Sequence, residues 1–324
     1  MMEVSEKRFI DARTGEIRWN WDSVEDAHIS HLYDRGEVGL RRLSERKAAE
    51  VVEYMAAHES INKAANACIT LTDEEIELLT NYAELNGDEA SYLRVLCFML
   101  KEGLYDNCVL WLPMTRNLRA GINDTDTEVY DRSPFGNHGT IYGAVWQTLP
   151  SGKSALSFDG VDDYVEVPDS ASLDITDAIT VMVWVNGDLA SLQKGILEKR
   201  DSTESGFALL SWKADEIRFE IPNIGLFIQK TGLESFRWYH VVGTYDSSTG
   251  KGYLYINGVE VGEGTASGAI KTNDARLFIG SRGIENRPSS YFNGTIDEVR
   301  IYSRALSEEE IRRLFNLTRV FYGV

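Results

Sequence analysis

Acidic residues crowd one short segment of this chain. Residues 153–167 read KSALSFDGVDDYVEV, and Asp159, Asp162 and Asp163 fall in one turn between two alternating apolar runs. Three carboxylates in one turn repel one another, and water or a hard cation relieves that repulsion. The segment therefore predicts a hairpin whose turn offers oxygen ligands to a cation such as calcium.

Loops that combine aromatic and polar side chains are the second place where the sequence could do chemistry. A sugar is held by aromatic rings that stack on its C–H faces and by a few polar groups that fix its orientation. The candidate glycan-binding residues are Trp212, Arg282, Asn286 and Tyr291. Trp184 and Trp238 lie in apolar strand patterns instead, which predicts that both are core residues.

Short apolar runs separated by turn signals must position these loops. From about residue 108 the hydrophobic period changes from about 3.6 to about 2 residues. Asn257-Gly258 lies between GYLYI and VEV, the strongest short-range signal of a hairpin. The run ITVMVWV at 179–185 is apolar on both faces, as in a central strand. The pattern predicts an antiparallel β-sandwich or jelly roll.

In their order and spacing, these segments resemble the laminin-G-like, concanavalin A-like jelly-roll domain. The resemblance covers roughly residues 108–315 and rests on these pieces: DRSPFGNHGTIYGAVW, LSFDGVDDYVEVPDS, ITVMVWVN, WYHVVGTYD, LYINGVEV, LFIGSR and NGTIDEVRIYSRALSEEEI. It implies a two-sheet antiparallel sandwich that binds a ligand, often a glycan and often with calcium. It does not imply catalysis.

The resemblance also implies where a structural calcium ion would lie. The first and last strands of such a domain are near each other, so the loops that hold Asp131, Asp159 and Asp297 are expected to converge. The candidate ligands are Asp131, Asn137, Asp159, Gly160 and Asp297. The alternative is that these side chains organise their own turns by accepting hydrogen bonds from nearby backbone N–H groups.

The spacing of the carboxylates argues against catalysis. Glu216 and Glu220 share one face of a predicted strand, but residues four apart on a strand are about 13 Å apart, beyond either glycosidase geometry. Asp297 and Glu298 are adjacent in a strand and are expected to point to opposite faces. The chain has no P-loop, nucleophile elbow, dinucleotide fingerprint or HExxH motif. We therefore expect a protein that is not an enzyme.

Composition and charge narrow the classes of partner that the chain could bind. The 324 residues carry a net charge of −18, which would repel nucleic acid. No stretch approaches the roughly 20 apolar residues of a membrane span. The N-terminal residues are charged and show no secretory signal. The three cysteines have no CxxC spacing and indicate no disulfide framework.

Residues 1–104 read as a separate helical domain, followed by the jelly roll at 105–324. RFIDARTGEIRWNW predicts an extended arm or small hairpin, Thr72 to Glu75 form a capping box, and a last helix is predicted from about 88 to 102. The predicted fold class is thus α+β multidomain, with a small α-helical domain before an antiparallel β-sandwich.

We interpret the chain as a non-enzymatic binding and structural protein. The absent signal favours a virion surface component, such as a decoration, fibre or tail-associated protein. Residues 1–104 would contact other proteins of an oligomeric assembly, and the jelly roll would bind a glycan or cell-surface ligand. The alternatives are a cell-associated, lectin-like adhesion protein exported by a non-standard route and, third, a glycan-active enzyme.

Overall fold

The computed structural model describes residues 8–10, 17–19, 87–116, 123–284 and 287–324. The chain divides into two compact units. One comprises Met1–Glu102 with Asn117–Ile122, and the other comprises Gly103–Arg116 with Asn123–Val324.

Three elements of the first unit are described. Strands β1 (Arg8–Ile10) and β2 (Ile17–Trp19) pair antiparallel, which confirms the predicted hairpin. Helix α5 (Gly87–Lys101) confirms the predicted last helix. Cys97 in α5 is disulfide-bonded, a feature that the cysteine spacing did not indicate. The other predicted helices and the capping box at 72–75 lie outside the described residues.

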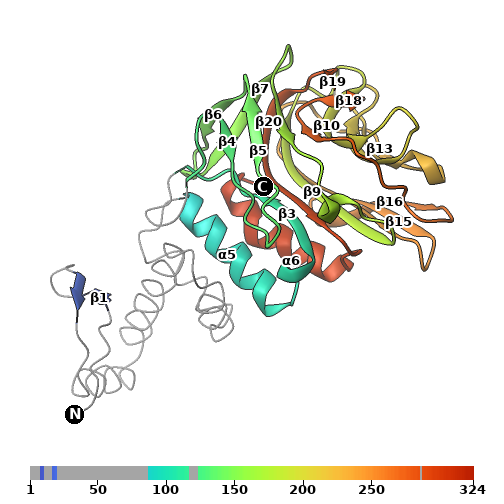
Figure 1. Ribbon diagram of the computed structural model, residues 1–324. Helices are drawn as coiled ribbons and strands as arrows, with labels where there is room; N and C mark the ends of the chain where they lie inside the picture. Colours follow the sequence, from blue (N-terminus) through green and yellow to red (C-terminus); the bar gives the residue numbers. More distant parts are fainter. Residues whose placement is uncertain (1–7, 11–16, 20–86, 117–122, 285–286) are drawn as a thin grey trace. The chain divides into compact units, whose positions relative to one another are not determined.

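The second unit is a sandwich of two eight-stranded sheets, as predicted (Figure 1). All of its strand pairs are antiparallel. The first sheet runs in the order β13 (Leu226–Lys230), β12 (Ile217–Ile221), β11 (Gly206–Ser211), β10 (Lys194–Arg200), β17 (Leu277–Ile279), β8 (Tyr164–Val167), β5 (Gly139–Tyr142), β4 (Glu128–Val129).

The second sheet packs on the first and has long strands at its centre. Its order is β16 (Val259–Thr265), β15 (Lys251–Ile256), β14 (Tyr239–Asp246), β9 (Ala178–Gly187), β20 (Asn293–Tyr302), β7 (Ser154–Asp159), β6 (Val145–Thr148), with β3 (Cys108–Leu112) beside β20. The separate hairpin of β18 (Arg282–Ile284) and β19 (Arg287–Ser289) contacts β10. Single 3-10 turns are η1 (Tyr105–Asn107), η2 (Ala171–Leu173), η3 (Pro222–Ile224) and η4 (Arg319–Phe321).

Alternation along each strand builds the core between the sheets. In β12, Ile217 and Phe219 join the apolar core cluster, and Arg218 between them lies on the opposite face. Gly243 of β14 lets the two sheets approach closely, because a Cβ there would lie 2.3 Å from the ring of Phe219. The turn at Asn257-Gly258 has positive φ at both residues, as its hairpin sequence predicts.

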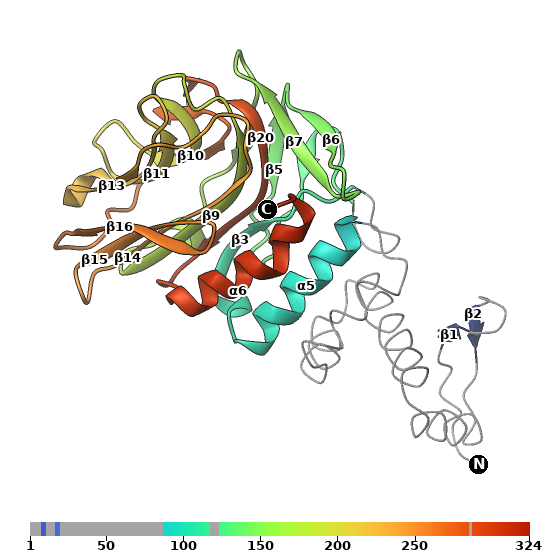
Figure 2. The ribbon, with the colours of Figure 1, turned by 180° about the vertical axis from the view of Figure 1, so that it is seen from behind.

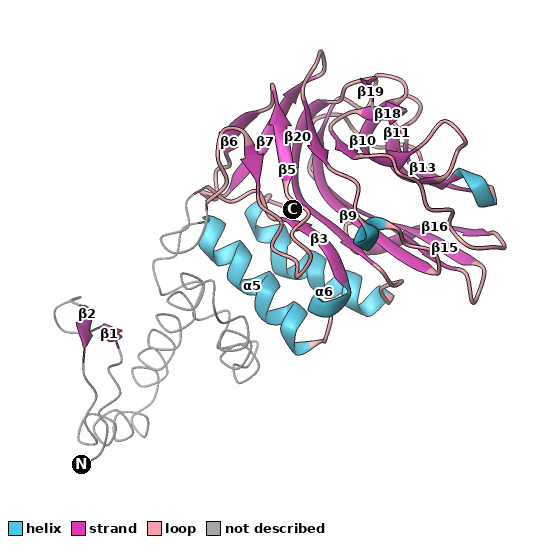
Figure 3. Ribbon diagram, viewed as in Figure 1, coloured by secondary structure: helices cyan, strands magenta, loops and turns pink. Residues whose placement is uncertain are grey.

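Helix α6 (Glu308–Thr318) covers the outer face of the second sheet (Figures 1 and 2). Ser307 and Glu310 form a capping box at its start. Trp184 of β9 is fully buried as predicted, but it lies beneath α6, where its Nε1 donates to Thr318 Oγ1 at 2.9 Å. Figure 3 shows how few helices accompany the strands of this unit.

Within the described ranges, none of the helices has the length and apolar character that crossing a bilayer would require.

Candidate functional site

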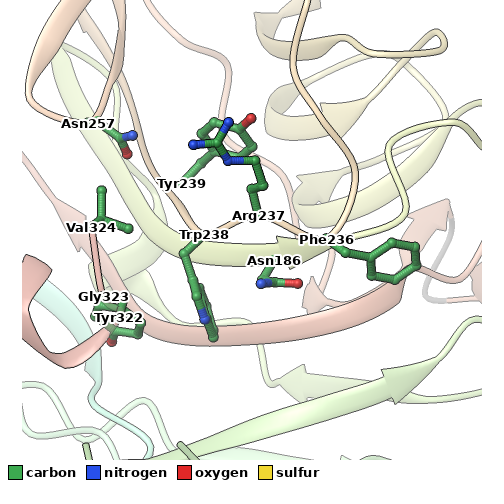
Figure 4. A pocket seen from close by; sticks show the side chains of 9 residues that line it. All are labelled: Asn186, Phe236, Arg237, Trp238, Tyr239, Asn257, Tyr322, Gly323 and Val324. Atoms are coloured by element: carbon green, nitrogen blue, oxygen red, sulfur yellow. The ribbon is translucent and has the colours of Figure 1, made fainter. Parts of the chain in front are cut away.

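A concave pocket lies beside the strand ends of the second sheet, where β9 ends and β14 begins, and we call it the edge pocket (Figure 4). Its volume is about 210 Å³, below the roughly 300–1,000 Å³ of pockets that hold drug-sized ligands, so it fits one small ring. Its lining combines aromatic side chains, two carboxamides and one guanidinium: Asn186, Phe236, Arg237, Trp238, Tyr239, Asn257, Tyr322, Gly323 and Val324.

The segment that enters β14 supplies four consecutive lining residues. Along it, Arg237 and Tyr239 project to one side, and Trp238 projects to the other, toward Tyr322 (Figure 4). The rings of Trp238 and Tyr322 are 4.7 Å apart and tilted by 55°. Trp238 is half-buried, so its predicted place in the core is wrong: it forms a wall of the edge pocket.

Phe236 has an unusual conformation for an aromatic residue. Its φ is +58°, and its side chain is 62% exposed. A bulky residue in the left-handed region costs of the order of 1–3 kcal/mol, and such strain clusters at ligand sites. The backbone is held there by the Phe236 N–H, which donates to the carbonyl of Gly187 at 2.8 Å.

Polar groups of the edge pocket are fixed by the strands. Asn257 Oδ1 accepts a hydrogen bond from the His240 N–H at 2.9 Å, and the Tyr239 hydroxyl accepts one from the Glu234 N–H at 3.0 Å. Arg237 pairs with Glu234 at 3.0 Å at the surface. The pocket thus presents oriented polar groups beside aromatic rings.

Two of the predicted glycan-binding residues, Trp212 and Arg282, come together on the outer face of the first sheet. The guanidinium of Arg218 lies 4.5 Å from the centroid of the Trp212 ring, and that of Arg282 lies 5.6 Å from it. Arg218 is also 5.9 Å from the exposed ring of Phe227. These are cation–π distances, so the Trp212 ring is already occupied by arginines of its own chain.

Buried carboxylates neutralise this group of arginines. Arg200 bridges Glu198 at 2.8 Å and Glu220 at 3.0 Å, and Arg218 pairs with Glu216 at 3.3 Å. Desolvation raises the pKa of Glu220, although Arg200 opposes the shift. We call Trp212 with these arginines and glutamates the Trp212 cluster.

The other predicted glycan residues lie elsewhere. The Tyr291 hydroxyl donates to the carbonyl of Pro288 at 3.3 Å, and its ring is 6.3 Å from Tyr164. Tyr164 stacks on Tyr142 at 4.6 Å. Among the described residues, no hydrogen bond or ring contact joins Tyr291 to Trp212. Asn286 lies outside the described residues.

The predicted calcium ligands separate into three hydrogen-bond networks. Asp131 accepts from the backbone N–H groups of Trp111, Ser133 and Asn137 at 2.7–2.9 Å, so both of its carboxylate oxygens organise a turn. The Asn137 amide donates to the Val109 carbonyl at 2.7 Å. Asp131 therefore realises the turn-organising alternative, whereas the Asn137 side chain joins segments that are distant in the sequence.

The turn after β7 keeps the other predicted ligands. Oxygens of Asp159, Asp162 and Asp163 lie within 4.8 Å of one another, a spacing that suits a hard cation. Desolvation raises the pKa of the Asp163 carboxyl. Gly160, at φ +81°, passes so close to Asn293 that a Cβ would lie 2.8 Å from that side chain. Calcium at this turn stays a prediction.

Asp297 does not face that turn. It pairs with Trp184 across β20 and β9, on the outer face of the second sheet, where Lys153 and Tyr322 bind its carboxyl at 2.8 and 2.7 Å. The expected convergence of Asp131, Asp159 and Asp297 is therefore wrong, because Asp297 lies four residues along β20 from Asn293, the strand partner of Asp159, a separation of about 13 Å.

The family comparison agrees with this architecture. Residues 159–312 match the concanavalin A-like lectin/glucanases superfamily. No curated protein matches the chain in sequence.

Solved structures with a similar fold include toxin binding domains. The binding domain of Paraclostridial Mosquitocidal Protein 1 is 18% identical, with a TM-score of 0.50 over 65% of this chain and 52% of that chain. The botulinum neurotoxin serotype D binding domain is 16% identical, with a TM-score of 0.51 over the same shares. This chain therefore spans about half the length of either domain. At these identities the likeness shows the fold alone.

Within this concanavalin A-like fold, the two aromatic sites differ in what they can do. The edge pocket offers a hollow, aromatic rings and polar groups around it. The Trp212 cluster offers arginines and glutamates that already form ion pairs with one another. Three aromatic residues within the four residues 236–239 were the sequence signal for the pocket, but its other walls come from distant segments.

Proposed function

We propose that the concanavalin A-like domain is a non-enzymatic glycan-binding module and that the edge pocket holds one sugar ring. The observation that carries the proposal is the lining of the pocket, which includes Phe236, Trp238, Tyr239 and Tyr322 together with two carboxamides. Aromatic rings beside a few oriented polar groups match the apolar faces and hydroxyl groups of a sugar.

The structural relatives support the same class of ligand. Cell entry of botulinum neurotoxin type C depends on interaction with two ganglioside molecules, and the serotype D ligand-binding domain forms a complex with N-acetylneuraminic acid. The binding domain of botulinum neurotoxin DC forms a complex with rat synaptotagmin II, a protein. We favour a glycan for this chain because the pocket has the size of a single ring.

A glycan array tests the proposal. The full chain and a Trp238→Ala variant are applied at equal concentration, with and without a chelator of divalent cations. We expect the wild type to bind a defined set of glycans and the variant to lose them, with circular dichroism showing that both remain folded. An array on which the wild type binds nothing in either condition contradicts the proposal.

For the setting of this domain we retain the proposal made from the sequence. Residues 1–104 attach the chain to an assembly, in first place the surface of a virus particle and in second place a cell surface. Mass spectrometry of purified particles and of cell-surface fractions separates the two. Recovery of the chain in neither fraction contradicts both.

A further inference from the structure

An amine and a carboxyl group meet in the closed interior beneath the C-terminal segment. Lys153 Nζ lies 2.9 Å from Asp297 Oδ1 and 2.8 Å from Oδ2, and both side chains are completely buried. Lys153 directly precedes β7, and Asp297 lies in β20, the neighbouring strand. The two residues are 144 positions apart in the chain.

Hydrogen bonds polarise the carboxyl group of Asp297, which makes its carbon a better electrophile. The Tyr322 hydroxyl donates to Oδ2 at 2.7 Å, and the Glu298 N–H donates to Oδ1 at 2.7 Å. Each carboxyl oxygen therefore has one donor, and a donor at this distance stabilises negative charge that develops on a carbonyl oxygen under attack. Desolvation raises the pKa of Asp297 to about 8, so the neutral acid, the form that an amine can attack, is present at neutral pH.

A second carboxylate stands beside the amine. Glu298 Oε1 lies 3.7 Å from Lys153 Nζ, and Arg300 together with the Trp111 indole N–H holds the other oxygen of Glu298. Neighbours in a regular strand point to opposite faces, so Asp297 and Glu298 should not both reach one lysine. They do so because β20 is irregular between Asp297 and Arg300, with φ +51° at Glu298.

We propose that Lys153 and Asp297 condense into an amide bond that cross-links the β7 and β20 segments of the domain. Within the buried pair, a proton passes from the ammonium group to the carboxylate. The neutral Nζ then attacks Asp297 Cγ, and the C–N bond forms. Glu298 accepts a proton from the attacking nitrogen and returns it to the leaving hydroxyl group. The C–O bond breaks and one water molecule leaves, with no change of oxidation state.

A second lysine provides the comparison within the same domain. Lys199 Nζ lies 2.8 Å from Asp169 Oδ1, a distance similar to that at Lys153, but the Asp169 side chain is 29% exposed. Water reaches that carboxyl, which favours the ionised pair and disfavours the loss of water. Only the pair at Lys153 combines complete burial, two donors on the carboxyl and a neighbouring carboxylate, among the lysine pairs of the described residues.

Intact-mass spectrometry of the full chain, denatured and reduced so that the disulfide does not contribute, tests the proposal. We expect a mass lower than the sequence mass by one water molecule. Peptide mapping is expected to recover one branched peptide that contains Lys153 and Asp297. A wild-type chain at its full sequence mass overturns the proposal, whatever the variants do.

Matched variants identify the chemistry. Lys153→Arg keeps the positive charge without the nucleophilic amine and is expected to show the full mass, whereas Lys199→Arg is expected to keep the loss of water. Glu298→Gln should slow the reaction, so that freshly refolded protein shows both masses. Loss of water that persists in Lys153→Arg overturns the assignment. Glycan binding is measured separately and does not depend on these results.

Discussion

The edge pocket and the Trp212 cluster are built from the same kinds of residue, but only the pocket leaves its aromatic rings around a hollow. In the cluster, Arg218 and Arg282 lie over the Trp212 ring, and glutamates neutralise them. In the pocket, Trp238 and its aromatic neighbours line a hollow, and Arg237 is paired only at the surface. An aromatic residue near an arginine therefore indicates a ligand site only where the ring is not already in use.

The difference follows from where the two sites lie in the sandwich. The cluster lies on the face of β10 and β12, the two strands beside β11, which bring charged side chains within reach of one another. The pocket lies where β9, the entry to β14, the hairpin at Asn257 and the C-terminal residues meet, so four segments leave space between them.

Trp238→Ala should produce the largest effect. We expect the dissociation constant for the selected glycan to rise at least about tenfold, or about 1.4 kcal/mol, because a stacking wall is removed. Isothermal titration with the best ligand from the array measures it. A Trp238→Phe variant, which keeps a ring, should retain most of the affinity. Equal affinities for all three proteins would place the ligand elsewhere.

Trp212→Ala should act on stability instead of binding. Two guanidiniums lose their aromatic partner, so we expect a loss of about 1–2 kcal/mol in the free energy of unfolding. Urea titration measures that loss, and the glycan affinity should stay within about twofold of wild type. The reverse pattern, with unchanged stability and lost glycan binding, would show that the glycan binds at the Trp212 cluster and not in the edge pocket.

Glu220 should give the Trp212 cluster a pH dependence that the edge pocket lacks. Its folded-state pKa is raised above the unfolded value, so the native state binds the proton more tightly. Its contribution to stability is therefore lost as the pH rises from about 4.3, the ordinary pKa of Glu, through the folded value. Relative to wild type, Glu220→Gln should gain in urea midpoint between pH 4 and pH 7. A constant difference contradicts this.

Removal of calcium from the Asp159 turn should have the smallest effect of these changes. If a cation relieves the three carboxylates, a chelator should lower the melting temperature of the wild type by a few degrees and leave Asp162→Asn nearly unaffected. Glycan binding in the edge pocket should not respond. Identical melting curves with and without chelator would remove calcium from the description of this domain.

Local patterns predicted most of the fold. Alternation and the Asn257-Gly258 turn predicted the sandwich, because these signals act over a few residues. The edge pocket could not be predicted in the same way. Its walls come from segments up to 138 positions apart, from Asn186 to Val324.

The orientation of Asp297 and Glu298 could not be predicted from the sequence either. Strict alternation predicts opposite faces, yet the irregularity in β20 brings both carboxylates to Lys153. Nothing in the letters TIDEVRIY marks that irregularity, since a positive φ at Glu298 has no local signal comparable to glycine. Likewise, no pattern distinguishes the occupied ring of Trp212 from the wall formed by Trp238.

Tyr322 has a place in both the edge pocket and the interior. Its ring packs on Trp184 at 4.0 Å and on Trp238 at 4.7 Å, and its hydroxyl donates to buried Asp297. A sugar that enters the hollow would thus meet a floor already immobilised from below. The Tyr322 side chain therefore has little rotational freedom left to lose when a ligand binds. This lowers the entropic cost of binding.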